Sequence, residues 1–193
     1  MNSVSVFCAS SPGHNKFYFD SAFAVGKKLA EEKIAVVYGG AKVGLMGAVA
    51  DGALSVGGKV IGVLPKFMSK KEIAHTGLTE LVLVESMHER KLKMHELSSG
   101  AIALPGGFGT MEELFEILTW LQLGLHKNPV GVLNQNGFYD PLLDQVKKMN
   151  FEGFLSENNM KMLLFSDNLN DLLKNMKNFK DPGTPKWLTE EQV

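Results

Sequence analysis

The chain has 193 residues, of which 45% are hydrophobic, so it has enough apolar side chains for one well-buried domain but too few to predict two. Its formal net charge of −1 excludes a basic excess, so we expect no nucleic-acid partner, and any phosphate site must rest on backbone amides and a few local cations. The single cysteine, Cys8, excludes an intramolecular disulfide.

Short β-rich runs alternate with helical patterns along the chain. Strands are predicted at 3–8, 34–38, 59–63, 80–84, 101–104, 130–133 and 162–165, and helices at 16–32, 45–56, 87–98, 110–125, 141–150 and 170–178. The strands are mostly apolar on both faces, as is typical of strands covered on both sides. The alternation predicts an α/β, Rossmann-like three-layer fold, in which a parallel sheet has helices on both faces.

The predicted domain spans residues 1–180. Residues 181–185, Asp-Pro-Gly-Thr-Pro, suit neither a helix nor an inner strand, so 181–193 is predicted to be a C-terminal tail. No apolar run approaches membrane-spanning length, and the N-terminus has no basic stretch followed by a signal core. We therefore expect a cytoplasmic protein without a membrane partner.

Two predicted strands run directly into glycine-rich turns that open helices, at 37–47 and at 103–110. Glycine lets phosphate oxygens approach main-chain amides that a Cβ would block, and a helix start offers unpaired N–H groups and a favourable dipole. Thr110 is expected to cap its helix or to donate its hydroxyl to the anion. The glycines could instead serve only to allow tight strand-to-helix turns.

Neither turn has the standard spacing of a nucleotide-binding fingerprint. The first lacks the G-x-G-x-x-G pattern of dinucleotide folds, and neither ends in the Gly-Lys-Ser/Thr of the P-loop. These absences argue against an NAD-dependent dehydrogenase and against an ATPase.

Three carboxylates, Glu112, Glu113 and Glu116, follow the second turn. In a helical projection Leu114, Leu118 and Leu121 form the core stripe, and Glu113 lies beside it on the flank near Thr110. Glu113 is therefore the best candidate for a half-buried reactive carboxylate. Favourable interaction with the helix dipole is an equally good explanation for acidic residues at this position.

A basic cluster occupies residues 87–95, after the strand predicted at 80–84. Adjacent Arg90 and Lys91 point about 100° apart on a helix, so one could reach an anion while the other faces elsewhere. From spacing alone a solvated charged face is the more economical interpretation. The histidines of the cluster have no partner set for a metal ion, and Cys8, in the apolar run 4–9, is interpreted as a buried structural thiol.

Taken together, these stretches resemble the Lonely Guy (LOG) family of cytokinin riboside 5′-monophosphate phosphoribohydrolases. Residues 105–113 (PGGFGTMEE) match its P-G-G-x-G-T-x-x-E motif. Further matches are 6–11 (VFCASS), 38–47 (YGGAKVGLMG), 87–91 (MHERK), 118–124 (LTWLQLG) and 128–131 (NPVG). The resemblance covers about residues 3–165, and one departure is Ala41, where many members have a third glycine.

The resemblance implies Arg90 and Glu113 as the catalytic pair. It implies substrate contacts for Gly40, Glu72, Lys91, Gly106, Gly107, Phe108, Gly109, Thr110, Met111, Glu112 and Thr119. It implies no metal and no cofactor. The implied reaction is hydrolysis of the N-glycosidic bond of an adenosine 5′-monophosphate, with or without an N6 substituent, to free base and ribose 5-phosphate.

Other functions stay open at this stage. A non-catalytic carrier of a nucleotide or phosphorylated cofactor would use similar glycine turns, and an enzyme of purine salvage would cleave AMP rather than a cytokinin nucleotide. An N6 prenyl group needs an apolar slot, for which Met87, Phe108, Trp120 and Leu123 are candidates. Lysine decarboxylase activity is not expected, because no lysine has a convincing pyridoxal-phosphate context.

The second half of the helix at 110–125 is unusually apolar, with Trp120, Leu121, Leu123 and Leu125. One helix cannot bury all of these against its own sheet. We therefore expect an isologous homodimer through this helix, which could bring Thr119 near the neighbouring site.

Overall fold

The computed structural model describes residues 1–69 and 73–181. They form one sheet of seven parallel strands in the order β4-β3-β2-β1-β5-β6-β7. The strands are β1 (Ser3–Phe7), β2 (Ala35–Tyr38), β3 (Val60–Pro65), β4 (Glu80–Val84), β5 (Ala101–Ala103), β6 (Val130–Leu133) and β7 (Leu163–Ser166). All seven predicted strands are confirmed, with boundaries that shift by two residues at most.

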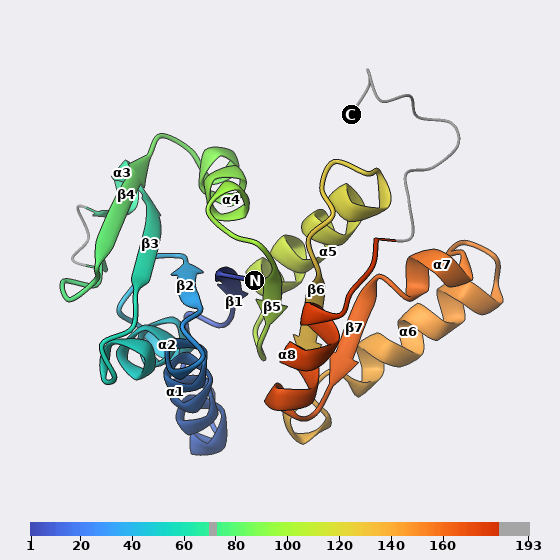
Figure 1. Cartoon of the computed structure of the whole chain (residues 1–193), viewed down its shortest axis with the longest axis horizontal. Coiled ribbons are helices and arrows are strands. Elements are labelled where there is room, and N and C mark those ends of the chain that lie inside the picture. Colours follow the sequence, from blue (N-terminus) through green and yellow to red (C-terminus); the bar gives the residue numbers. More distant parts are fainter. Residues whose placement is uncertain (70–72, 182–193) are drawn as a thin grey trace.

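Helices cover both faces of the sheet, as predicted (Figure 1). They are α1 (Lys16–Glu31), α2 (Gly44–Leu54), α3 (Lys66–Ser69), α4 (Met87–Glu96), α5 (Phe108–Gln122), α6 (Asp140–Phe151), α7 (Glu157–Met160) and α8 (Leu169–Lys177), with a 3-10 turn at Gln135–Gly137. Helices α1, α2 and α8 lie on one face and α4 and α5 on the other, while α6 and α7 lie near the β7 end (Figure 1). The sequence did not predict α3, α7 or the 3-10 turn, because elements this short have no helical periodicity.

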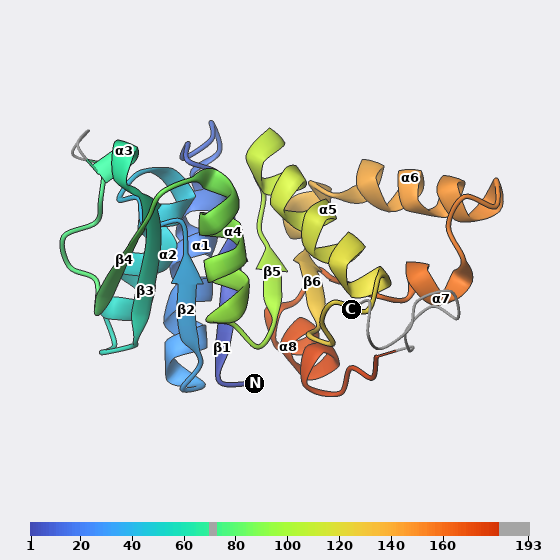
Figure 2. The ribbon, with the colours of Figure 1, turned by 90° about the horizontal axis from the view of Figure 1, so that it is seen from above.

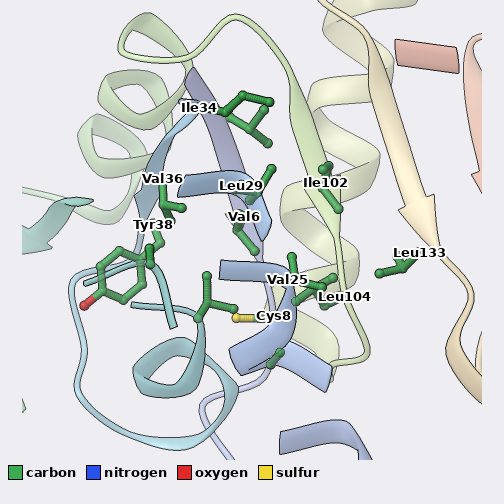
Figure 3. Packing of buried hydrophobic residues seen from close by; sticks show 14 of the residues in the cluster. Val6, Cys8, Val25, Leu29, Ile34, Val36, Tyr38, Ile102, Leu104 and Leu133 are labelled. Carbon is green, nitrogen blue, oxygen red and sulfur yellow. The ribbon is translucent and has the colours of Figure 1, made fainter. Parts of the chain in front are cut away.

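Side chains of the central strands point alternately to the two faces of the sheet. Because both faces are buried, these strands are apolar throughout. On one face Val6 and Cys8 of the β1 segment pack with Val36 of β2 and with Val25 and Leu29 of α1 (Figure 3). The residues between them in the strands, which include Phe7, Val37 and Ala103, pack under α5 with Leu114, Ile117 and Leu121. Each face of the sheet thus has its own hydrophobic cluster.

Two details of the prediction are wrong. The buried stripe of α5 contains Ile117, whereas Leu118 is only partly buried. Strand β4 is not covered on both sides: Leu81 and Leu83 are 39% and 46% exposed, and β4 is one of the two edge strands of the described sheet.

The strand order changes direction between β1 and β5. The chain runs from β1 to β2 on one side and returns through α4 to β5 on the other side of β1. In open α/β sheets the crevice outside the carboxyl ends of the strands at such a switch point is where ligands bind. Of the predicted tail, 181–193, only Asp181 falls among the described residues, so the tail itself lies outside them.

Candidate active site

The second glycine turn leads from β5 into α5 at the switch point. Helix α5 begins at Phe108 with Gly107 as its N-cap, and no side chain of the described residues caps it. The first bond of the helix runs from the Met111 amide to the Gly107 carbonyl, so the amides of the first turn point out of the helix without an internal acceptor. These amides and the helix dipole make an anion-binding position.

Of the two roles expected for Thr110, the structure does not show the helix cap. The helix begins two residues earlier than expected, and Thr110 lies inside its first turn, 3% exposed. A Cβ at Gly106 would stand 2.1 Å from the Thr110 Oγ1, so Gly106 makes room for this side chain. The Thr110 hydroxyl therefore does not accept from the amides of the helix start, and donation to an anion stays the predicted role.

Gly107 and Gly109 have a different reason to be glycine. A Cβ built at either position would meet no protein atom within 4 Å, and Gly107 has an ordinary extended φ of −98°. Both residues line a cavity at this edge of the sheet. The protein itself therefore has room for a side chain at these positions. A side chain there would obstruct only a ligand that approaches the amides.

Because a Cβ at Gly109 would meet a ligand but no protein atom within 4 Å, Gly109→Ala should raise stability and weaken ligand binding. The variant should be about 0.5–1 kcal/mol more stable, because alanine favours the helix over glycine. It should bind a phosphorylated ligand about tenfold more weakly or worse, the order of one charged hydrogen bond. Thermal unfolding and the inhibition constant of ribose 5-phosphate would measure both. Unchanged ligand binding would contradict an anion site at this turn.

The first glycine turn, after β2, is organised differently. The amides of Leu45 and Met46, at the start of α2, already donate to the Ala9 carbonyl over 3.0 and 3.3 Å. The Gly40 carbonyl accepts from His75, and Ala41 forms a bridge with Ala74. Two amides at this helix start thus already have an acceptor, unlike those at the start of α5, and phosphate contact by the first turn stays a prediction.

The absence of a third glycine at Ala41 causes no strain. The left-handed conformations of this turn fall on Gly40 and Gly44, at φ of 75° and 59°. Gly39 is needed for another purpose, because a Cβ there would stand 1.9 Å from Nη2 of Arg90. The first turn thus makes space for a side chain of α4.

Arg90 and Glu113 form a largely buried ion pair at the switch point. Arg90 Nη1 donates to Glu113 Oε1 over 3.1 Å, and each side chain is 11% exposed. Arg90 Nε also donates to the Val63 carbonyl, near the carboxyl end of β3, over 3.2 Å. Ser86 caps α4 by accepting from Glu89, which fixes the helix start and brings Arg90 into its first turn.

The position of Glu113 agrees with the helical projection, which placed it half-buried on the flank near Thr110. Burial raises the pKa of the Glu113 carboxyl above its ordinary value, and the Arg90 guanidinium opposes this shift. The pair is the strongest candidate for chemistry in the described part of the chain, because a buried carboxylate with its own cation faces a cavity.

The cavity has a volume of about 360 Å³, within the range of small-molecule sites. It is lined by Val6, Cys8, Ala9, Ser10, Ser11, Gly39, Ala41, Met46, Met68, Arg90, Gly107, Phe108, Gly109, Thr110 and Glu113. Ser10 and Ser11 of this lining are not among the residues predicted from the sequence. Their position directly after β1, beside the turn after β5, was the signal that could have found them.

Cys8 reaches the cavity wall but belongs to the hydrophobic cluster around β1 (Figure 3). Burial raises the pKa of its thiol, so the thiol stays protonated. This agrees with the interpretation of Cys8 as a structural thiol. Within the described residues, no group of three His, Cys, Asp or Glu side chains could hold a metal ion.

Several predicted contact residues lie away from this cavity. Lys91 forms ion pairs with Glu112 and Glu116, and Thr119 donates to the Phe115 carbonyl about 14 Å along α5 from Thr110. Glu72 lies outside the described residues. Gly40 and Met111 are not part of the lining either. For these residues and for Glu112, contact with substrate stays a prediction.

Of the four residues suggested for an apolar slot, only Phe108 lines the cavity, with 96% of its side chain exposed. Trp120 instead packs edge-to-face against His95, with 5.7 Å between ring centroids. The cavity has other apolar residues that the sequence did not single out, Met46 and Met68. No helix in the described residues has the length and apolar character needed to cross a membrane.

The fold and this site define the class of protein: a Rossmann-like α/β protein with an uncapped helix start at the switch point of its sheet. A family model described as possible lysine decarboxylase matches residues 46–176. The chain is 50% identical over 155 residues to the cytokinin riboside 5′-monophosphate phosphoribohydrolase of Rhodococcoides fascians, covering 80% of this chain and 78% of that one. It is 41% identical over 176 residues to the enzyme of the same name, LOG2, of Arabidopsis thaliana, covering 91% and 83%. The chain therefore belongs to the LOG family.

A solved structure of the molybdenum cofactor carrier protein of Chlamydomonas reinhardtii is also similar. Its TM-score is 0.68 with 18% identity, over 91% of this chain and 95% of that chain. At this level of identity the likeness concerns the fold alone, and it agrees with the predicted Rossmann-like architecture.

Proposed function

We propose that this chain hydrolyses the N-glycosidic bond of an adenosine 5′-monophosphate, releasing the free base and ribose 5-phosphate. The observation that carries the proposal is the buried Arg90–Glu113 pair, which faces the cavity beside the uncapped start of α5. The names of the relatives from R. fascians and A. thaliana support N6-substituted, cytokinin-type adenosine monophosphates as the substrates. Met46 and Met68 in the cavity are compatible with such a base.

In this proposal the 5′-phosphate binds the first-turn amides of α5 and the Thr110 hydroxyl. These contacts hold the sugar in place and convert remote binding energy into positioning. The bond from C1′ to the base breaks through an oxocarbenium-like transition state, in which positive charge develops on the ribose.

Glu113 stabilises this charge and orients the attacking water. Water provides the hydroxyl that bonds to C1′, and its remaining proton ends on the departing base, so atoms and charge balance. Arg90 keeps Glu113 ionised and holds ribose hydroxyls or phosphate oxygens in the cavity.

The test is an assay for free base from AMP and from isopentenyladenosine 5′-monophosphate with the purified chain. Release of base supports the proposal, and the ratio of the two kcat/KM values separates a cytokinin enzyme from one of purine salvage. No release from any nucleotide would favour the carrier function instead.

The acid limb of the profile of kcat/KM against pH should have its midpoint above about pH 4.3, since about 4.3 is the pKa of an ordinary glutamate. Activity needs ionised Glu113, and burial raises its pKa, so activity is lost on acidification at a higher pH than for an exposed glutamate. The charged and titratable groups around it are Arg90, Lys91, Glu112, Glu116 and Cys8. The measurement is kcat/KM between pH 4 and pH 8, and constant activity down to pH 4 would contradict this role.

We also propose that the chain forms a homodimer through α5. Phe115 on this helix is 38% exposed and Leu125, three residues after its end, is 47% exposed, which supports an apolar contact with a second copy. Sedimentation at micromolar concentration should give the mass of a dimer, and a monomer would contradict the proposal. A cytoplasmic location and a single domain over residues 1–180 remain predictions from the sequence.

A further inference from the structure

The segment 73–77, between α3 and β4, pairs with the first glycine turn. The Lys42 amide donates to the Ile73 carbonyl over 2.8 Å, and the His75 amide donates to the Gly40 carbonyl over 3.0 Å. Between these two bonds the segment and the turn form an antiparallel bridge. The backbone of a segment that comes later in the chain thus supports this turn.

The His75 side chain ties the same segment to α2. Its Nε2 lies 3.0 Å from Oδ1 of Asp51, and its Nδ1 accepts from the Gly77 amide over 3.0 Å. Because Nδ1 is an acceptor, the neutral imidazole carries its proton on Nε2 and donates it to Asp51. Both ring nitrogens therefore have partners, and the side chain is only 12% exposed.

Asp51 belongs to α2, on the face of the sheet opposite to α4. Figure 2 shows α2 behind the strands and α4 in front of them. Burial raises the pKa of the Tyr38 hydroxyl, and the nearby Asp51 carboxylate adds to this rise. Tyr38 is the last residue of β2, directly before the glycine turn. The contact between His75 and Asp51 therefore lies close to the point where the turn begins.

The same turn forms the wall against which Arg90 lies. Gly39 and Ala41 line the cavity together with Arg90. A Cβ at Gly39 would stand 1.9 Å from Nη2 of Arg90, so the guanidinium lies directly against the backbone of the turn. A shift of this backbone would therefore change the position at which the guanidinium meets Glu113.

The contact between His75 and Asp51 contributes little to the stability of the fold. The Asp51 side chain is 57% exposed, so an ion pair or hydrogen bond to it is screened by water. Removal of His75 would leave no buried charge without a partner. An effect of this contact on turnover would therefore come from the placement of the turn.

We propose that His75 and Asp51 are positioning residues: their hydrogen bond holds the segment 73–77 on the first glycine turn and so fixes the wall behind the Arg90 guanidinium. The proposal rests on the proposed function of the Arg90–Glu113 pair. It predicts that the two residues act as one unit, and that their loss changes the chemistry of Glu113 without a large change in stability.

The first test is a double-mutant cycle of His75→Leu and Asp51→Ala, with kcat and KM for base release from AMP and from isopentenyladenosine 5′-monophosphate. Each single variant should lower kcat about fivefold or more, the order of one hydrogen bond, because the Arg90 guanidinium loses its fixed position. The double variant should lose little more than either single variant, since both substitutions remove the same contact.

Two further variants complete this test. Asp51→Asn keeps an acceptor oxygen for Nε2 of His75 and should recover most of kcat. The matched control is Asp144→Ala, which removes an ion pair with Lys147 whose side chains are 75% and 60% exposed, and it should leave kcat unchanged.

The second test is the acid limb of the profile of kcat/KM against pH. If the Arg90 guanidinium moves away from Glu113, the pKa of that carboxyl rises, so the midpoint should move to higher pH in His75→Leu and in Asp51→Ala. Asp51→Ala retains the imidazole of His75, so a shift that both variants share does not come from the loss of that titratable group. The charged and titratable groups around Glu113 are the same in both variants: Arg90, Lys91, Glu112, Glu116 and Cys8.

Other roles of the contact give different results. If it only stabilises the fold, the unfolding temperature falls while kcat per folded molecule and the acid limb stay unchanged. If His75 contacts the nucleotide, KM rises in His75→Leu and the effects of the two substitutions add. Either result would overturn the positioning role while the unmodified chain remains active. Absence of base release by the unmodified chain would overturn the proposed function together with it.

Discussion

Glu113→Gln should lower kcat for base release by about 10² or more, because the variant cannot stabilise the oxocarbenium-like transition state or activate water. Glutamine keeps an oxygen that can accept from Arg90, so the guanidinium is not left without a partner and the fold should persist. Binding of ribose 5-phosphate should change little, because the phosphate contacts belong to the start of α5.

The matched control is Glu96→Gln, the same substitution at an exposed carboxylate near the end of α4. It should leave kcat unchanged. Steady-state kinetics with ribose 5-phosphate as inhibitor separate the two effects. Near-normal kcat for Glu113→Gln would remove Glu113 from the chemistry and favour a carrier.

Arg90→Ala should also lower turnover by about 10² or more. The variant loses the cation that opposes the effect of burial on Glu113, so the pKa of that carboxyl rises further and the acid limb of the profile moves to higher pH. Arg90→Lys should not restore full activity, because one ammonium cannot reproduce the two directed contacts to Val63 and Glu113.

Gly39→Ala tests the same pair without removing either partner. The new Cβ would occupy the place of Nη2 of Arg90, so the guanidinium must move away from Glu113. The variant should share most of the kcat loss of Arg90→Ala while all charges are retained. Wild-type kinetics would mean that the placement of Arg90 in the cavity has no catalytic importance.

Much of the fold was predictable because it depends on local patterns. Short apolar runs between amphipathic helical patterns predicted the seven strands and the longer helices. Strands covered on both faces are continuously apolar, and helices covered on one face carry a period of 3.6 residues. Periodicity also placed Glu113 on the flank of its helix. It misjudged β4, because local apolarity does not reveal which strand lies at an edge.

The two glycine turns illustrate where local reasoning ends. Both turns have glycines before a helix, and from the sequence they are equivalent phosphate sites. In the structure the first helix start is occupied by the Ala9 carbonyl, a residue far away along the chain. Of the two turns, only the one after β5 leaves the first amides of its helix without a cap. The hydrogen bonds to the Ala9 carbonyl join residues far apart in the chain, and such bonds leave no periodic signal in the sequence.

The sequence by itself determined the order of the elements, the glycine turn at 105–110 and a carboxylate on its helix, because these depend on residues within one or two turns of each other. Spacing alone favoured a solvated face for Arg90 and Lys91, and could say only that the two point in different directions. The tertiary structure decided that Arg90 enters the cavity through the space left by Gly39, while Lys91 joins α4 to α5. That choice depends on how two helices pack on one sheet, and packing is a property of surfaces that meet only after the chain has folded.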